Sequence, residues 1–240
     1  MSEDRYRLSF DRVAEVYERS RPEYAPDALD WIAERLPLRR VLDLGAGTGK
    51  LTRQLAALGA DVVAVEPGAE MRAVLQRVLP DVEALAGSAE SIPLPESSVD
   101  VVTAAQSFHW FRTGEALAEM HRVLRPGGGF ALLWNHWDDE DTLLRTLNDL
   151  VDALRDDRAD DEQHEALYAS RLFRTEEARN FRHSEELAAD VVVERVSSVS
   201  AVSAAPPEVR ERTLEQARLL IGDGPVHFPM VTTVVVGDRV

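Results

Sequence analysis

The segment AAQSFHWFRT, residues 104–113, brings together side chains that can do chemistry. Gln106, His109 and Trp110 lie within five positions and follow VDVVTAA, an apolar run typical of a buried strand. Histidine has a reference pKa near 6.5, so His109 could accept a proton near neutral pH. A histidine after a strand can also be purely structural, and the segment alone leaves both interpretations open.

A glycine-rich segment, VLDLGAGTGK, places Asp43 two positions before Gly45, with Gly47 and Gly49 following at alternate positions. Glycines at such a turn let the backbone bend tightly and approach a ligand closely. Dinucleotide-binding loops read G-x-G-x-x-G, and their pyrophosphate rests on a helix N-terminus. The spacing here is G-x-G-x-G, and the Asp43 carboxylate would repel a pyrophosphate. It would suit a ligand that carries an ammonium or sulfonium group.

A second acidic residue, Glu66, ends the apolar run DVVAVE. Its two carboxylate oxygens could accept hydrogen bonds from both hydroxyls of a ribose. Together, Asp43 and Glu66 predict a site for a nucleoside with a cationic, amino-acid-like tail. S-adenosylmethionine fits this description, whereas the glycine spacing disfavours a nicotinamide dinucleotide and hence a dehydrogenase.

Alternating strands and helices would position these residues. Helical spacing of apolar residues predicts helices at 27–36, 50–59, 69–80 and 113–128. Short apolar runs predict strands at 39–45, 61–66, 81–87, 98–105 and 129–135. This alternation predicts a doubly wound, Rossmann-like α/β fold with a mostly parallel sheet and helices on both faces. Ligands of such sheets bind outside the carboxyl ends of the strands, where the strand order reverses.

The pattern changes after Trp134. We expect an amphipathic helix at 141–157, a strand and then a helix at 180–196, a helix at 206–222 and a final strand at 228–240. The sheet would then have seven strands. A helical insertion at 138–172, after the fifth strand, would lie over the carboxyl edge of the sheet as a lid.

Four blocks of the sequence resemble class I S-adenosylmethionine-dependent methyltransferases that act on small molecules, the methyltransferase type 11 group. The blocks read VLDLGAGTGKLTRQLA, VVAVEPGAEM, GSAESIPLPESSVDVVTAAQSFHWF and EMHRVLRPGGGFAL. The resemblance extends over nearly the whole chain through two further segments, FDRVAEVYERSRPEY and FPMVTTVVVGDR. The chain also has some similarity to trans-aconitate-type methyltransferases. The resemblance is specific for cofactor and fold and weak for substrate.

The resemblance implies a single domain over residues 1–240. An N-terminal segment, 1–26, would cover the cofactor and carry Tyr17 and Arg21. The cofactor-binding core would span 27–137, and residues 173–240 would complete the sheet. Arg21 could pair with the carboxylate of the cofactor in a charge-assisted contact.

The resemblance also implies which residues of the core bind S-adenosylmethionine. The methionine part would lie against Gly45, Ala46 and Gly47, with Asp43 near its amino group. The ribose and adenine would lie against Glu66, Pro67, Ser88 and Ala89, with Gln106 beside the sulfonium. Many relatives have Asp where Ser88 stands, so the hydrogen bond to the adenine amine would be weaker or absent here.

His109 and Trp110 would face the methyl acceptor. His109 could serve as a base for a hydroxyl acceptor, whereas a carboxylate acceptor needs no base. Some relatives with the Gln-x-x-His-Trp pattern esterify small carboxylic acids. We therefore expect methyl transfer to a small molecule, at oxygen. The alternative is a cofactor-binding protein of this fold without methyl transfer, either a regulatory binder or a cyclase.

Composition narrows the remaining possibilities. The formal net charge is −16, which would repel nucleic acids unless basic residues cluster on one face. The absence of cysteine excludes disulfides, thiolate metal sites and a cysteine nucleophile. No apolar run approaches the roughly 18 residues of a membrane span, and the N-terminus has no signal-peptide pattern. We expect a cytoplasmic monomer or homodimer that binds no metal, nucleic acid or membrane.

Overall fold

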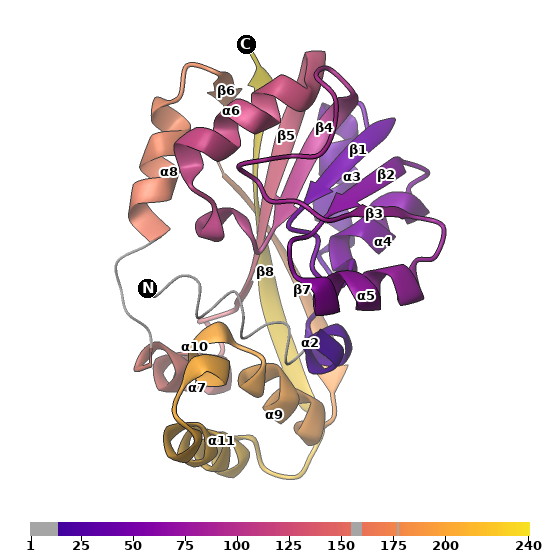
Figure 1. Cartoon of the computed structure of the whole chain (residues 1–240). Coiled ribbons are helices and arrows are strands. Elements are labelled where there is room, and N and C mark those ends of the chain that lie inside the picture. Colours follow the sequence, from indigo (N-terminus) through magenta and orange to yellow (C-terminus); the bar gives the residue numbers. More distant parts are fainter. Residues whose placement is uncertain (1–13, 155–159, 177) are drawn as a thin grey trace. The chain divides into compact units, whose positions relative to one another are not determined.

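The computed structural model describes residues 14–154, 160–176 and 178–240 (Figure 1). Its described residues form an eight-stranded sheet in the order β3-β2-β1-β4-β5-β8-β6, with β7 paired to β8. The strands are β1 (Arg40–Leu44), β2 (Asp61–Val65), β3 (Glu83–Leu85), β4 (Val99–Ala105), β5 (Leu124–Trp137), β6 (Phe173–Thr175), β7 (Arg179–Leu187) and β8 (Val226–Arg239). The first five strands are parallel, and β6 is antiparallel to β8.

The mostly parallel α/β fold expected from the sequence is confirmed, but the sheet has eight strands rather than seven. The additional strand is β6, whose three residues pair with Gly237–Arg239 at the end of β8. Three residues are too few to display the two-residue periodicity of a strand, so no sequence pattern marks β6.

Helices follow most of the strands. They are α2 (Ala14–Ser20), α3 (Pro26–Arg35), α4 (Lys50–Ala57), α5 (Ala69–Val78), α6 (Thr113–Val123), α7 (Thr142–Asp152), α8 (Asp160–Ala169), α9 (Ala189–Ser197), α10 (Ser200–Ala204) and α11 (Pro207–Ile221). A short 3-10 helix, η1, covers Phe108–Trp110. None of the described helices is long and apolar enough to cross a membrane.

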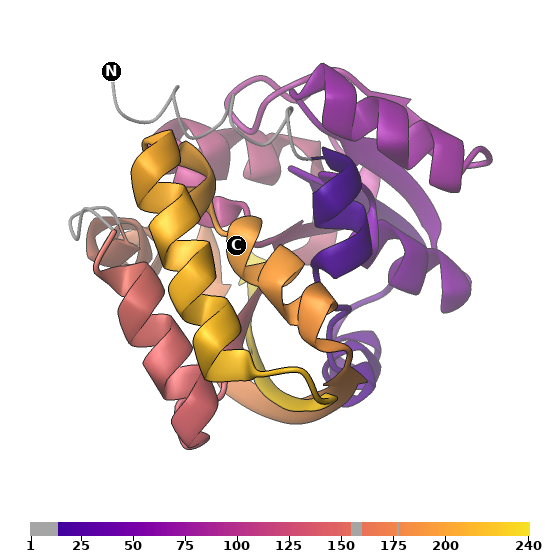
Figure 2. The same cartoon turned by 90° about the horizontal axis from the view of Figure 1, so that it is seen from below.

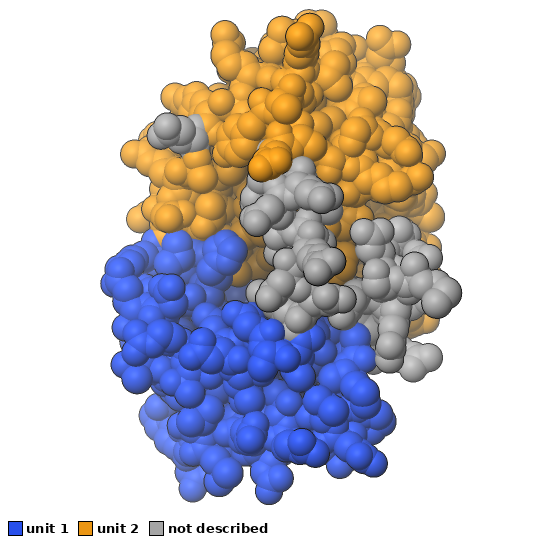
Figure 3. Space-filling view, turned by 90° about the vertical axis from the view of Figure 1, so that its left-hand side faces the viewer, with its two compact units in different colours: residues 1–22, 136–156, 182–231 blue, residues 23–135, 157–181, 232–240 orange. Residues whose placement is uncertain are grey.

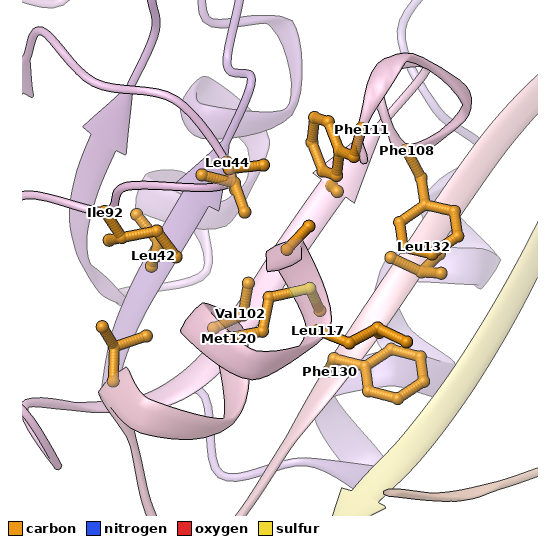
Figure 4. Packing of buried hydrophobic residues seen from close by; sticks show 14 of the residues in the cluster. Leu42, Leu44, Ile92, Val102, Phe108, Phe111, Leu117, Met120, Phe130 and Leu132 are labelled. Atoms are coloured by element: carbon orange, nitrogen blue, oxygen red, sulfur yellow. The ribbon is translucent and has the colours of Figure 1, made fainter. Parts of the chain in front are cut away.

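Alternate residues of the parallel strands enter two apolar cores, one on each face of the sheet. Leu42 and Val102 join the core that α6 covers, where Met120 packs against the strands (Figure 4). Their neighbours Val41 and Val101 join the core covered by α3 and α4. Burial on both faces explains why these strands are continuous apolar runs.

Contacts divide the chain into two compact units, coloured separately in Figure 3. Unit 2 comprises residues 23–135, 157–181 and 232–240 and contains both cores of the sheet. Unit 1 comprises residues 1–22, 136–156 and 182–231. Within unit 1, α11 packs against α7 and α9 (Figure 2) around a third apolar core that includes Leu147, Val196 and Phe228.

The segment expected to act as a lid contributes to both units. Its first helix, α7, belongs to unit 1, and its second helix, α8, belongs to unit 2 and packs against α6. The lid role of residues 138–172 and the domain boundaries given above remain predictions.

Candidate functional site

The strand order reverses between β1 and β4, which are neighbours although two strand–helix units separate them in sequence. This is the position where ligands bind doubly wound sheets. The glycine-rich loop, residues 45–49, follows β1, and Glu66 follows β2. The segment 106–110 follows β4. Three groups of residues selected from the sequence therefore lie at one edge of the sheet in unit 2.

Close packing and left-handed backbone conformations explain the glycines of the loop. Gly45, Gly47 and Gly49 have φ values of +69°, +57° and +90°. A Cβ atom on Gly45 would lie 2.7 Å from Cβ of Ser107, whereas a Cβ atom on Gly47 would meet nothing within 4 Å. Ser107 Oγ also donates a hydrogen bond to the carbonyl oxygen of Leu44, at 3.0 Å. The loops after β1 and β4 thus touch directly, with open space beside Gly47.

Glu66 shapes the loop in addition to offering acceptor oxygens. Its Oε2 accepts a hydrogen bond from the Gly47 amide at 2.8 Å, and its Oε1 accepts one from the Gly68 amide at 2.7 Å. Glu66 is half-buried, and Pro67 beside it is exposed. The amide of Ala46 donates to the carbonyl oxygen of Val65, which ties the loop to the end of β2.

Asp43 is enclosed in the protein, with 1% of its surface exposed. Thr52 Oγ1 donates to Oδ2 at 2.6 Å, and Thr103 Oγ1 donates to Oδ1 at 3.2 Å. Burial raises the pKa of the Asp43 carboxyl to about 6, and the hydrogen bonds from Thr52 and Thr103 oppose this rise. The carboxyl group thereby connects β1 to α4 and β4. Its expected contact with the cofactor amine remains a prediction.

Ser88 and Ala89 follow β3 and lie in a short turn. The carbonyl oxygen of Ser88 accepts a hydrogen bond from the Ser91 amide at 3.2 Å. Ala89 is 4% exposed and packs in the core with Ile92. Because its methyl group is part of the core, contact between Ala89 and a cofactor would come from its main chain.

Gln106 and η1 follow β4 at the carboxyl edge of the sheet. Gln106 has φ +54°, a conformation uncommon for a residue with a side chain, and its Nε2 donates to the Asn135 carbonyl oxygen at 2.8 Å. In η1, Phe108 is 1% exposed and makes an edge contact with Trp134. Its neighbours His109 and Trp110 are half-buried, with ring centroids 4.7 Å apart. Phe108 thus anchors the turn that carries both side chains.

Tyr17 and Arg21 belong to α2 in unit 1. The guanidinium carbon of Arg21 lies 5.2 Å from the centroid of the Tyr17 ring, and its Nη2 donates to the Ser198 carbonyl oxygen at 2.8 Å. Buried Arg195 of α9 donates from Nε to the Ser20 carbonyl oxygen at 2.6 Å. These bonds fasten α2 to α9 within unit 1. The expected contact of Tyr17 and Arg21 with the cofactor remains a prediction.

Sequence reasoning missed several polar residues that shape this edge, including Thr52, Thr103, Ser107 and Asn135. Asn135 follows an apolar run in β5 as Gln106 follows β4, so the same pattern could have identified it. The two threonines and Ser107 carry no such signal, because their partners depend on how the loops and strands pack. Among the described residues, no group of three or more His, Cys, Asp or Glu could hold a metal ion.

Comparison with known proteins gives a consistent result. The methyltransferase domain family matches residues 42–132. An uncharacterized methyltransferase of Mycobacterium tuberculosis is 40% identical over 218 residues, which cover 91% of this chain and 87% of the relative. An uncharacterized methyltransferase of Schizosaccharomyces pombe is 40% identical over 143 residues, or 58% of this chain and 57% of the relative. The structure of a candidate type II methyltransferase from Anaeromyxobacter dehalogenans is 27% identical with a TM-score of 0.71, covering 91% of this chain and 97% of that chain.

Proposed function

This chain belongs to the class I S-adenosylmethionine-dependent methyltransferases, and on that premise we propose that it binds S-adenosylmethionine at the carboxyl edge of β1, β2 and β4. The observation that carries the proposal is the position of Glu66, whose carboxylate bonds to the Gly47 amide across the ends of β1 and β2. Ribose hydroxyls are ligands that such a carboxylate accepts well. The open space beside Gly47 suits the methionine part of the cofactor.

The proposal assigns the remaining cofactor contacts to the residues that the family resemblance implies. Pro67, exposed after Glu66, would pack against adenine, with Ser88 and the main chain of Ala89 at the adenine edge. Gln106 would lie beside the sulfonium, on the β4 side of the glycine-rich loop. Tyr17 and Arg21 would close over the cofactor from the N-terminal segment.

The second part of the proposal concerns the acceptor, a small molecule methylated at oxygen. When bound, the cofactor would supply a methyl group on a sulfonium for transfer to an acceptor oxygen, with a neutral thioether as the leaving group. The protein must therefore align the two molecules and exclude water. Half-buried Trp110 would line the acceptor pocket, and His109 would accept the proton of a hydroxyl acceptor. We also propose a cytoplasmic monomer or homodimer that binds no nucleic acid, in keeping with its net charge of −16.

Calorimetry with S-adenosylhomocysteine, the demethylated product of the cofactor, tests the cofactor site. Glu66→Ala should weaken binding about 100-fold, because it removes the charged acceptor of two hydrogen bonds that the ribose hydroxyls would donate. Glu70→Ala, an exposed change in the first turn of α5, is the matched control and should bind like the wild-type chain. An unchanged dissociation constant for Glu66→Ala would refute the assigned role, and tight NAD binding would refute the cofactor.

A methyl-transfer assay tests the acceptor. Radiolabelled S-adenosylmethionine would be incubated with a panel of small hydroxyl, carboxylate, amine and carbon acceptors. The proposal predicts labelled product at oxygen, identified by mass spectrometry. Label confined to nitrogen or carbon products would contradict methyl transfer to oxygen while leaving the cofactor site intact.

A further inference from the structure

Asn135 lies where the chain leaves unit 2, and both ends of its side-chain amide are bonded. Its Nδ2 donates to the carbonyl oxygen of Glu23 at 2.9 Å, and its Oδ1 accepts from Thr232 Oγ1 at 2.5 Å. Thr232 Oγ1 in turn accepts a hydrogen bond from the Ala25 amide at 3.0 Å. Thr232 is fully buried. Asn135 and these partners belong to three segments that are distant in sequence.

All three segments are points where the chain passes between the two units. Glu23 is the first residue of unit 2 after the N-terminal segment, Asn135 is the last residue before β5 enters unit 1, and Thr232 is the first residue after β8 returns. Three of the five crossings of the chain are therefore joined by one side chain. A fourth crossing lies beside Asn180, whose Oδ1 accepts from Thr233 Oγ1 at 2.9 Å.

The main chain of Asn135 reaches the candidate site. Its carbonyl oxygen accepts the hydrogen bond from Gln106 Nε2 at 2.8 Å, and the Gln106 amide donates to the Leu133 carbonyl oxygen at 2.9 Å. Gln106 has a left-handed backbone conformation that glutamine adopts at a cost, so these bonds must hold it there. The direction of the Gln106 side chain thus depends on where Asn135 lies.

We propose that Asn135 is a positioning residue, which ties the Gln106 side chain to the three chain crossings and so fixes Gln106 beside the bound cofactor. Asn suits this role because its amide is both donor and acceptor, whereas Asp would lose the bond to Glu23 and Ala would lose both. The inference rests on the proposed function, in which Gln106 is a cofactor neighbour.

A double-mutant cycle tests whether Asn135 acts through Gln106. Asn135→Ala, Gln106→Met and the double variant would be titrated with S-adenosylhomocysteine and with adenosine, which lacks the amino-acid part. Each single variant should bind S-adenosylhomocysteine about three- to tenfold more weakly, the usual effect of one neutral hydrogen bond. The double variant should bind no more weakly than Gln106→Met, and adenosine affinity should stay unchanged throughout.

Thr232 provides a second pair of variants that leaves Asn135 in place. Thr232→Val removes the hydroxyl that donates to Asn135 and should weaken S-adenosylhomocysteine binding, whereas Thr232→Ser keeps the hydroxyl and should restore it. This pair tests whether the bonds of the Asn135 side chain position Gln106, even if Asn135→Ala does not fold.

Three results would overturn the inference: additive losses in the cycle, equal losses for adenosine, or no difference between Thr232→Val and Thr232→Ser. A wild-type chain that binds no S-adenosylhomocysteine would instead refute the proposed function, and the inference with it.

Discussion

Asp43→Asn should alter the pH dependence of stability in a way that can be calculated. Asp43 is enclosed, and burial raises the pKa of its carboxyl to about 6, from 3.8 as the ordinary value. The folded chain therefore holds a proton on Asp43 at pH values where the unfolded chain has released it. The stability that this group contributes is greatest below about pH 4 and is lost as the pH rises through about 6.

The size of the effect follows from the two pKa values. At about 1.4 kcal/mol for each pH unit by which they differ, their difference corresponds to about 3 kcal/mol of folding stability between low and high pH. Between pH 5 and pH 8 the free energy of unfolding of the wild-type chain should lose about 1.4 kcal/mol through Asp43 alone. Asn cannot ionise, yet its amide can accept a hydrogen bond from Thr52 and donate one to Thr103.

The assay is urea unfolding of both chains at pH 5, 6, 7 and 8. At each pH, the free energy of unfolding of the wild-type chain is subtracted from that of the variant. The subtraction cancels the contribution of the other Asp and Glu residues, which both chains share. The free energy of unfolding of Asp43→Asn, relative to that of the wild-type chain, should rise by about 1.4 kcal/mol from pH 5 to pH 8. A difference that does not change with pH would refute the raised pKa.

Thr52→Val gives a second test of the same cause. The Thr52 hydroxyl donates to Asp43 Oδ2 and favours the ionised carboxylate. Its removal should move the loss of stability to higher pH and should cost more free energy at pH 8 than at pH 5. A cost that is equal at both pH values would mean that Thr52 stabilises the protein without acting on the charge of Asp43.

Two further predictions concern the loops after β1 and β4. Gly45→Ala should lower the free energy of unfolding by about 1–3 kcal/mol more than Gly59→Ala. Both glycines have positive φ, but only Gly45 approaches Ser107. Equal losses of stability in chemical denaturation would contradict the close contact. His109→Ala should lower kcat about 100-fold or more for a hydroxyl acceptor while S-adenosylhomocysteine affinity changes little; parallel losses of turnover and affinity would indicate a structural role.

The sequence sufficed for the parallel strands β1 to β5 of unit 2 and for placing candidate residues at their carboxyl ends. Parallel strands buried on both faces must be apolar throughout, and helices must connect them, so the alternation along the chain implies the sheet. The carboxyl ends of parallel strands share one edge. Asp43, Glu66 and Gln106 could therefore be assigned to that edge from their places after successive apolar runs.

Features that depend on contacts between distant segments could not be read in this way. The β6 strand exists through its pairing with the end of β8. The division of residues 138–172 between two units depends on which apolar surfaces α7 and α8 find. The side chain of Ala89 packs in the apolar core, which its place after β3 does not reveal.

Residue types and spacing by themselves determined the fold class and which residues lie at the carboxyl ends of β1, β2 and β4, because both follow from periodicity along one chain. Only the tertiary structure decided how those residues are held: Glu66 to the Gly47 amide, Asp43 to two threonine hydroxyls, and Gln106 to Asn135. The physical reason is that a hydrogen bond requires two groups within about 3 Å in a suitable direction. For partners from different segments, that geometry exists only once the strands and loops have packed.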